Sequence, residues 1–370
     1  MADSAFHASA AEGFCSACLA SVRRTFADHL PLYACVIIFG AAVFLIAALY
    51  RIEIPLSASL SFLEGVPLFV GFGVSVSAAV QLIRLLRMKE QRPLNAMARW
   101  LRDGFLSGER PGNIFHTLIT LTPLMITFDA LKEQIPQIHP FEWDETFTRW
   151  DRILGMGHLP WQILQPLVGH PPITAGLNFI YDLWFVLMFG CLFWQAFSAH
   201  ASRLRMQFLV AFALAWFVGG DLLATVFSSA GPCFYGYLHP ARDPYAPLMA
   251  YLRDTSLHWP IWSVKIQNLL WQSYTHGGGT VAGISAMPSM HVTIAVLLAL
   301  LGVRTNRPLG IALTLFAAAV VVGSVALGWH YLVDGIGGVV LAILFWIAAR
   351  IICRGQGQIP DVPIRYERAR

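Results

Sequence analysis

The chain has 370 residues, of which 56% are hydrophobic and only 12% charged, and its mean hydropathy is +0.60. Soluble domains carry roughly twice that charged fraction, about 25%. The composition therefore excludes an ordinary soluble domain, and a formal net charge of +4 is too small to indicate a nucleic-acid partner. The sequence predicts an all-α integral membrane protein.

Eight apolar runs of membrane-spanning length are predicted. In chain order their approximate bounds are 31–50, 66–86, 114–131, 174–197, 206–228, 288–304, 308–327 and 333–353. A span needs about 20 apolar residues, and in lipid its backbone polar groups must bond within the segment, so each run is expected to be a helix. Residues 94–106 mix aromatic, aliphatic and arginine side chains, which favours a helix in the membrane interface. Residues 140–170, rich in Trp and Pro, are also expected at a membrane surface.

Arginine and lysine gather on one side of this eight-span arrangement. They occur between spans two and three, after spans four and six and in the C-terminal tail, and the N-terminus falls on the same side. The positive-inside rule makes that side cytoplasmic. We therefore expect a bacterial inner-membrane protein whose opposite face meets the periplasm, or a protein whose opposite face meets an organelle lumen.

Two clusters of ionisable residues lie at the outer, N-terminal ends of predicted helices. One is the P-S-M-H segment at 288–291, which runs into span six, and the other is His330 with Asp334 at the start of span eight. His330 and Asp334 are four residues apart, so a helix places both on one face, where the carboxylate can orient the imidazole. Ionisable groups at the membrane edge are candidates for function.

This arrangement suits a phosphate group. A helix N-terminus offers free N–H groups and a positive dipole end, which favour an anion. Two such ends facing one pocket, each with a histidine, could bind a phosphoryl group, so that one imidazole attacks phosphorus and the other protonates the leaving oxygen. The alternative is that each histidine only caps its helix or packs at the interface.

The same residues resemble a known family. The segment 288–291 resembles the P-S-G-H element of the type 2 phosphatidic acid phosphatase superfamily, and His330 with Asp334 resembles its last motif, H-x-x-x-D. The P-S-M-H form, the His330-Tyr331 context and the stretches 150–155, 160–161 and 181–182 look most like the inositol phosphorylceramide synthase branch.

The resemblance covers roughly residues 110–350 and implies a division of the chain. Residues 1–110 would form an N-terminal region with two transmembrane helices and the interfacial helix. Residues 111–353 would form a six-helix phosphatase or phosphotransferase core, and residues 354–370 a cytoplasmic tail.

The resemblance also implies roles for single residues. His330 would be the nucleophile that forms a phosphohistidine, Asp334 would orient and stabilise it, and His291 would be the general acid and base. Ser289 would help to hold a phosphate oxygen. No metal or other cofactor is expected, because histidine carries the covalent step.

The sequence departs from the superfamily pattern where basic residues are concerned. The matching place for the first motif, K-x6-R-P, is the segment 224–232, which has neither basic residue, and Gly323-Ser324 stands in place of the Ser-Arg of the last motif. A phosphomonoester carries about −1.5 to −2 charges at neutral pH, whereas a diester carries one, so a site with few cations suits a diester. Tyr235 and Arg242 in the long outer loop are the candidate phosphate contacts, although Arg242 could equally form a salt bridge with Asp243 or another acid.

These observations predict an enzyme that moves an inositol-phosphate-like head group from a phospholipid donor to the hydroxyl of a lipid acceptor on the outer face of the membrane. Two alternatives stay open. One is a phosphatase for a lipid phosphate or a polyprenyl pyrophosphate, and the other is a transporter or scaffold without chemistry. Asp182 and Asp221, in spans four and five, are each expected to have a polar partner, because a lone acid in the membrane is costly.

Overall fold

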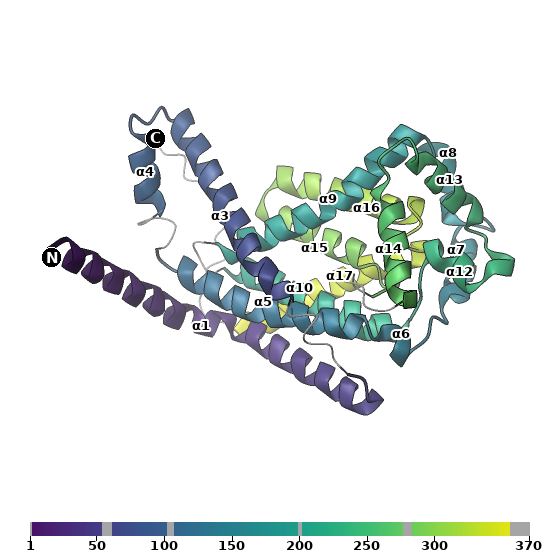
Figure 1. The fold of residues 1–370 in the computed structure, drawn as a ribbon, viewed down its shortest axis with the longest axis horizontal. Helices are drawn as coiled ribbons and strands as arrows, with labels where there is room; N and C mark the ends of the chain where they lie inside the picture. Colours follow the sequence, from purple (N-terminus) through teal and green to yellow (C-terminus); the bar gives the residue numbers. More distant parts are fainter. Residues whose placement is uncertain (1, 54–60, 102–106, 199–201, 277–282, 356–370) are drawn as a thin grey trace.

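The structure is a computed structural model that describes residues 2–53, 61–101, 107–198, 202–276 and 283–355. All regular secondary structure within these ranges is helical. Figure 1 shows a bundle of long helices, a group of short helices at one end of it, and one very long N-terminal helix that runs along the bundle and beyond it.

Seven helices in the described ranges are long and apolar enough to cross a membrane: Ser16–Tyr50, Val70–Arg87, Arg110–Lys132, Pro171–Ala196, Arg203–Val226, Arg307–Ala326 and Leu332–Ile352. They confirm an all-α membrane protein. The sixth predicted span, 288–304, is helix α15 (Met290–Thr305), which has only 16 residues. At 1.5 Å per residue such a helix rises about 24 Å, less than the roughly 30 Å of a hydrocarbon core. The predicted count of eight is therefore not confirmed.

The central bundle consists of α15 and five further helical segments that alternate in direction. They are α5 (Arg110–Lys132), α9 (Pro171–Ala196), α10 (Arg203–Leu214) with its continuation through the π-helical η2 (Ala215–Leu223) and α11 (Ala224–Val226), α16 (Arg307–Ala326) and α17 (Leu332–Ile352). α15 packs against α16 and α17, α17 against α10, and η2 against α5. Local sequence starts these helices where expected, since Ser289 caps α15, Asn306 caps α16 and prolines open α9 and α16.

The arginines of the bundle mark the end that lies away from the starts of α15 and α17. Arg205 is buried there and donates from Nε to the Gln195 carbonyl (2.6 Å), from Nη2 to Thr117 Oγ1 (2.7 Å) and from Nη1 to His29 Nε2 (2.9 Å). These bonds tie α10 to α9, α5 and α1. The opposite end of the bundle carries His291 and His330.

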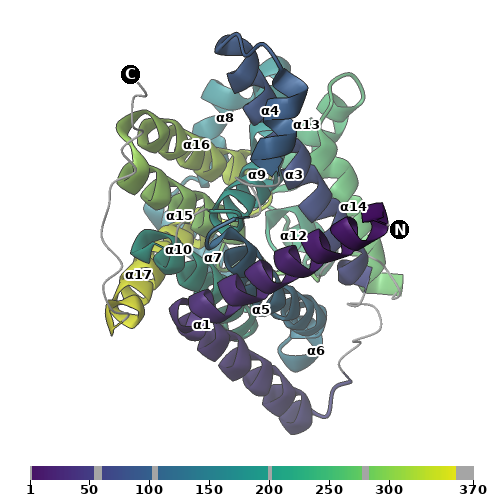
Figure 2. The same cartoon turned by 90° about the vertical axis from the view of Figure 1, so that its left-hand side faces the viewer.

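The N-terminal region is α1 (Ala2–Tyr50), α3 (Ser61–Arg87) and α4 (Pro93–Arg99). α1 packs against α5 and α10, and Figure 2 shows it crossing over α5. It begins well before the apolar run predicted at 31–50 and has 49 residues, so the apolar run is only its second part. α4 covers the start of the predicted interfacial helix, of which residues 102–106 lie outside the described residues.

Short helices gather at the end of the bundle where α15 and α17 begin (Figure 1). They are α6 (Ile135–Ile138), α7 (Asp144–Leu154), α8 (Pro160–Val168), α12 (Pro232–Leu238), η3 (Pro240–Arg242), α13 (Ala246–Ser256) and α14 (Trp262–His276). α7 contacts α17, and α8 contacts α16. At the other end α17 continues into η4 (Cys353–Gly355), and the rest of the predicted tail, 356–370, lies outside the described residues.

Candidate active site

The structure brings the two histidine motifs together. His291 is the second residue of α15, His330 lies just before α17, and Asp334 is the third residue of α17. The Ser289 N–H donates to the Asp334 carbonyl (3.2 Å). At Gly338 of α17 a Cβ atom would lie 2.8 Å from the Ser289 carbonyl oxygen, so a glycine is needed for this approach. The ring centroids of His291 and His330 are 6.3 Å apart.

His330 is held in one tautomer. Its Nδ1 lies 2.8 Å from the Ala286 carbonyl oxygen. A carbonyl can only accept, so Nδ1 carries the proton and Nε2 keeps a free electron pair. Burial lowers the pKa of His330 to about 4; its hydrogen bond to Ala286 opposes this and the charge of Lys132 adds to it. The imidazole is therefore neutral at pH 7, which is the form that a nucleophile needs.

Asp334 contacts His330 without being its main hydrogen-bond partner. Its Oδ2 lies 3.5 Å from His330 Nδ1 and accepts a shorter bond from the Tyr331 N–H (2.9 Å). A distance of 3.5 Å is longer than a good hydrogen bond. The Ala286 carbonyl therefore fixes the ring, and the buried Asp334 carboxylate lies where it can stabilise positive charge on the imidazole.

His291 is held by an aromatic wall from α9. Its ring stacks on Tyr181, with centroids 4.5 Å apart and planes at 16°, and lies 4.3 Å from the ring of Trp184. Trp184 Nε1 also donates to the His291 carbonyl (2.9 Å). The side chain is half-buried, so its ring is fixed on one side and is open on another.

Only one of the two helix ends has free N–H groups, so the expectation that both ends can bind phosphate is wrong for α17. Asp151 of α7 accepts from the N–H groups of Leu332 (2.9 Å) and Val333 (3.0 Å), which are the first two of α17. Burial raises the pKa of Asp151 to about 7, and these two bonds oppose that rise. At α15, by contrast, the N–H groups of Met290 and His291 have no hydrogen-bond partner among the described residues. The anion-binding end is therefore that of α15.

The three predicted phosphate contacts lie in different places. Ser289 is fully buried, and its Oγ accepts from the Val292 N–H at 3.4 Å as the cap of α15. Tyr235 is buried in α12 with its ring against Tyr245, and Arg242 is exposed in η3. No contact within the described ranges joins Tyr235 or Arg242 to the histidine pair, so their roles stay predictions.

The acids of the spans differ in their partners. Asp182 accepts from Asn178 Nδ2 (2.8 Å), as expected. Asp221 is fully buried in η2, and neither of its carboxylate oxygens has a hydrogen-bond partner in the part of the chain that is described. Its polar partner is Lys132, which interacts with it electrostatically without a hydrogen bond. The predicted pair between Arg242 and Asp243 does not form, because Asp243 accepts from the Tyr245 N–H instead (2.8 Å).

Sequence reasoning missed the roles of both of these α7 acids, Asp151 and Asp144. Asp144 is buried and accepts from the Tyr331 hydroxyl (2.7 Å), the Gly231 N–H (2.8 Å) and the Ala230 N–H (2.9 Å). Asp144 and Asp151 are seven residues apart, which is two helical turns, so both face the same way from α7. Their seven-residue spacing, within the stretch 140–170 that is predicted to lie at a membrane surface, could have indicated that the two acids lie on one face of a helix. Through these two acids, α7 positions the three residues that follow His330, which are Tyr331, Leu332 and Val333.

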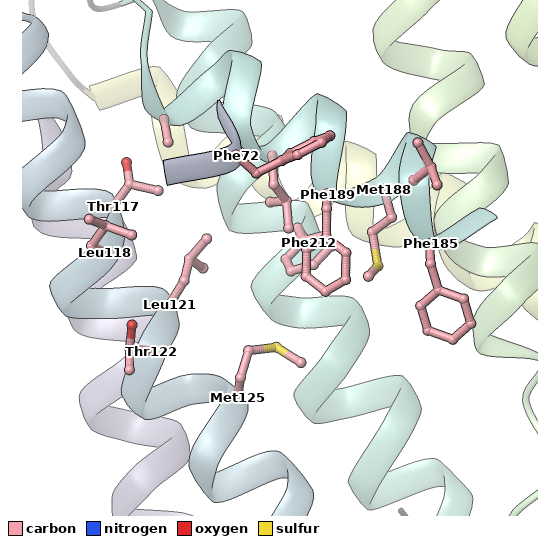
Figure 3. A pocket seen from close by; sticks show the side chains of 13 residues that line it. Phe72, Thr117, Leu118, Leu121, Thr122, Met125, Phe185, Met188, Phe189 and Phe212 are labelled. Carbon is pink, nitrogen blue, oxygen red and sulfur yellow. The ribbon is translucent and has the colours of Figure 1, made fainter. Parts of the chain in front are cut away.

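An apolar cavity within the bundle has one lining residue that contacts His291. It has a volume of about 430 Å³ and is lined by residues of α3, α5, α9 and α10. Figure 3 shows side chains of α5, among them Leu121 and Met125, on the opposite side of the cavity from Phe185 and Phe189 of α9. The ring of Phe185 also meets that of His291 edge-on, with centroids 5.9 Å apart. The cavity wall and the site therefore share a residue.

No curated protein and no solved structure matches this chain. The family model of the PAP2 superfamily, the type 2 phosphatidic acid phosphatases, matches residues 145–348, which is more than half of the chain. The match runs from α7 to α17 and includes both histidine motifs. It confirms the resemblance at the level of the superfamily, whose members carry out phosphatase and phosphotransferase reactions. The chain belongs to the PAP2 superfamily.

Proposed function

We propose that this protein is a lipid phosphotransferase, which moves a phosphate-bearing head group from a phospholipid to the hydroxyl of a lipid acceptor through His330. The observation that carries the proposal is the free Nε2 of a neutral, buried His330, whose ring lies 6.3 Å from that of His291. Two imidazoles at this separation can act on one phosphoryl group from two sides.

In the first step, His330 Nε2 attacks phosphorus, a P–N bond forms, and the P–O bond to the diacylglycerol oxygen breaks. His291 enters this step as the imidazolium, donates a proton to that leaving oxygen and becomes neutral. The Ala286 carbonyl keeps the Nδ1 proton in place, and the Asp334 carboxylate offsets the positive charge that develops on the ring. The free N–H groups of α15 face the negative phosphoryl oxygens.

In the second step, the hydroxyl of the lipid acceptor gives its proton to His291 while its oxygen attacks phosphorus. The P–N bond breaks, and His330 returns to its neutral form. Both histidines end as they began, so the cycle needs no metal or redox partner. Water in place of the acceptor would give hydrolysis by the same route.

A lipid substrate is supported by the apolar cavity, which reaches Phe185 at the wall of the site and can take an acyl chain. The first donor to test is one with an inositol-phosphate head group, because the motifs at 288–291 and 150–155 resemble the inositol phosphorylceramide synthase branch, and a sphingolipid-type hydroxyl is the matching acceptor. The arginine-bearing end of the bundle lies away from His291 and His330, which supports a site on the periplasmic or lumenal side.

The test is product analysis with purified protein in detergent, using a head-group-labelled phospholipid with and without a hydroxyl-bearing lipid. The control variant is His330→Asn, whose amide N–H can keep the bond to the Ala286 carbonyl while Nε2 is lost. Transfer by the wild type and none by His330→Asn is the expected result. Release of the phosphate-bearing group regardless of acceptor would identify a phosphatase, and equal activity of the two proteins would show that the histidine has no chemical role.

A further inference from the structure

The histidine site lacks the basic residues that its superfamily motifs usually supply. The segment 224–232 contains none, and Gly323-Ser324 replaces the usual Ser-Arg. The N–H groups at the start of α17 are occupied by Asp151. Arg242, the cation expected from the loop, is exposed and does not contact the histidines within the described residues. Another positively charged side chain is therefore needed to bind the phosphoryl oxygens.

Lys132, at the end of α5, is such a group. Its side chain is only 9% exposed, and its ammonium forms no hydrogen bond or ion pair within the described ranges. Nζ lies 5.9 Å from the centre of the Phe128 ring, one turn back on the same helix. The backbone of Lys132 and Glu133 lies directly against Gly283, where the described chain enters the loop that leads to His291.

Asp221 lies next to this lysine. Its neighbour Gly220 approaches both α5 and α15 so closely that a Cβ there would lie 2.8 Å from the Phe128 ring and 3.6 Å from Met290 Sδ. Asp221 is fully buried, and its two oxygens lack hydrogen-bond partners. The π-helical turn that carries it is a form of helix often found at functional sites.

The charge of Lys132 acts on this acid and on both histidines. Lys132 is near enough to Asp221, His291 and His330 to interact electrostatically with each of them, yet it forms no ion pair within 4.0 Å of Asp221. A buried cation and anion that are not in contact regain little of the free energy lost on leaving water. The three N–H donors of the ammonium therefore lack the acceptors that a purely structural pair would supply.

We propose that Lys132 binds the substrate phosphoryl group between the two histidines, and that Asp221 keeps Lys132 charged and in place. This inference rests on the proposed function, and it supplies the cation from α5 instead of from the superfamily motif. Lys132 offset by Asp221 brings little net positive charge to the site. Such a pair suits the single charge of a phosphodiester better than a phosphomonoester, which carries about −1.5 to −2 at pH 7.

The test compares Lys132→Met, Lys132→Arg, Asp221→Asn and the double variant Lys132→Met/Asp221→Asn with the wild type. Lys265→Met is the matched control, because Lys265 is exposed on α14. Binding of inorganic phosphate and of dimethyl phosphate is measured as the ligand-dependent rise in unfolding temperature, and lipid transfer is measured as kcat and KM.

Losing a hydrogen bond to a charged group should weaken anion binding about 10- to 100-fold in Lys132→Met, with KM rising by a similar factor. Lys132→Arg should keep most of the binding, and Lys265→Met all of it. The double variant should regain the unfolding temperature of the wild type without regaining anion binding, because Asp221→Asn removes the buried charge that Lys132→Met leaves alone.

Recovery of both stability and anion binding in the double variant would overturn the proposal, since Lys132 would then only neutralise Asp221. A wild type that binds neither anion would overturn it as well. Anion binding that depends on Lys132 in a protein that transfers no head group would sustain this inference and count against the proposed function alone.

Discussion

Two buried tyrosines near the site can be compared to predict how much a hydrogen bond to a charged group contributes to the free energy of unfolding. The Tyr331 hydroxyl donates to the Asp144 carboxylate at 2.7 Å, whereas the Tyr245 hydroxyl pairs with the neutral Thr148 hydroxyl at 3.2 Å. Tyr331 is 0% exposed and Tyr245 2%. Tyr331→Phe and Tyr245→Phe therefore remove the same oxygen from equally buried rings and differ in the charge of the partner.

The magnitudes follow from that difference. A hydrogen bond to a charged group contributes about 1.5–3 kcal/mol and one between neutral groups about 0.5–1.5 kcal/mol. Asp144 keeps its bonds from the Ala230 and Gly231 N–H groups in Tyr331→Phe, so its carboxylate is not left without partners. We expect Tyr331→Phe to lower the free energy of unfolding by about 1 kcal/mol more than Tyr245→Phe.

The assay is unfolding in mixed detergent and SDS micelles, followed by tryptophan fluorescence. The background Asp144→Asn serves as a control, because the extra loss in Tyr331→Phe should shrink when the acceptor is no longer charged. Equal losses for the two Phe variants, or no loss for Tyr331→Phe, would refute the idea that α7 anchors the residue next to His330 through a charged bond.

Three further predictions concern activity. Because burial lowers the pKa of His330 to about 4, the acid-side decline of kcat/KM, where this imidazole gains its proton, should lie near pH 4. Lys132→Met should shift this decline to higher pH, and an acid-side decline near pH 6.5 in the wild type would contradict the prediction. Met125→Trp should fill part of the cavity and lower transfer from long-chain donors more than transfer from short-chain donors. Leu315→Trp, on an exposed face of α16, should leave transfer from both kinds of donor unchanged. An equal effect of Met125→Trp on both chain lengths would argue against the cavity as the acyl site. EDTA should leave transfer unchanged, because a histidine carries the covalent step, and loss of activity that added metal restores would show the mechanism to be wrong.

Hydropathy located the helices of the bundle well. The spans predicted at 174–197 and 333–353 are α9 (Pro171–Ala196) and α17 (Leu332–Ile352). It failed where a helix continues beyond its apolar part, because the first half of α1 is too polar to register as a span. The sixth run, predicted at 288–304, is itself short, and α15 (Met290–Thr305) has nearly the same length.

The histidine motifs could be predicted because they depend on short spacing. His330 and Asp334 are four residues apart, and P-S-M-H fixes His291 at a helix start. The partners of these residues could not be predicted, because they come from distant elements. Asp151 and Leu332, which it binds, are 181 residues apart in the sequence. The group of Ala286 that holds His330 is a backbone carbonyl, which every residue has, so the amino-acid sequence does not single it out.

The environment of Lys132 is another feature that could not be predicted from the sequence. A lysine at the end of an apolar span usually lies in the membrane interface with its charge in water. Only the packing of α5 against η2 and the loop before α15 buries Lys132 beside Asp221, and no local pattern in the sequence encodes that contact.

The most direct test of the central claim is to trap the covalent intermediate. Wild type and His330→Asn would be mixed with a phospholipid labelled with phosphorus-32 in its head group, quenched in base without acceptor, and digested for peptide mapping. We predict an acid-labile, base-stable label on His330 in the wild type, its loss on adding a lipid hydroxyl, and no label in His330→Asn. Turnover by the wild type with no label on His330, or with the label on His291, would contradict the account.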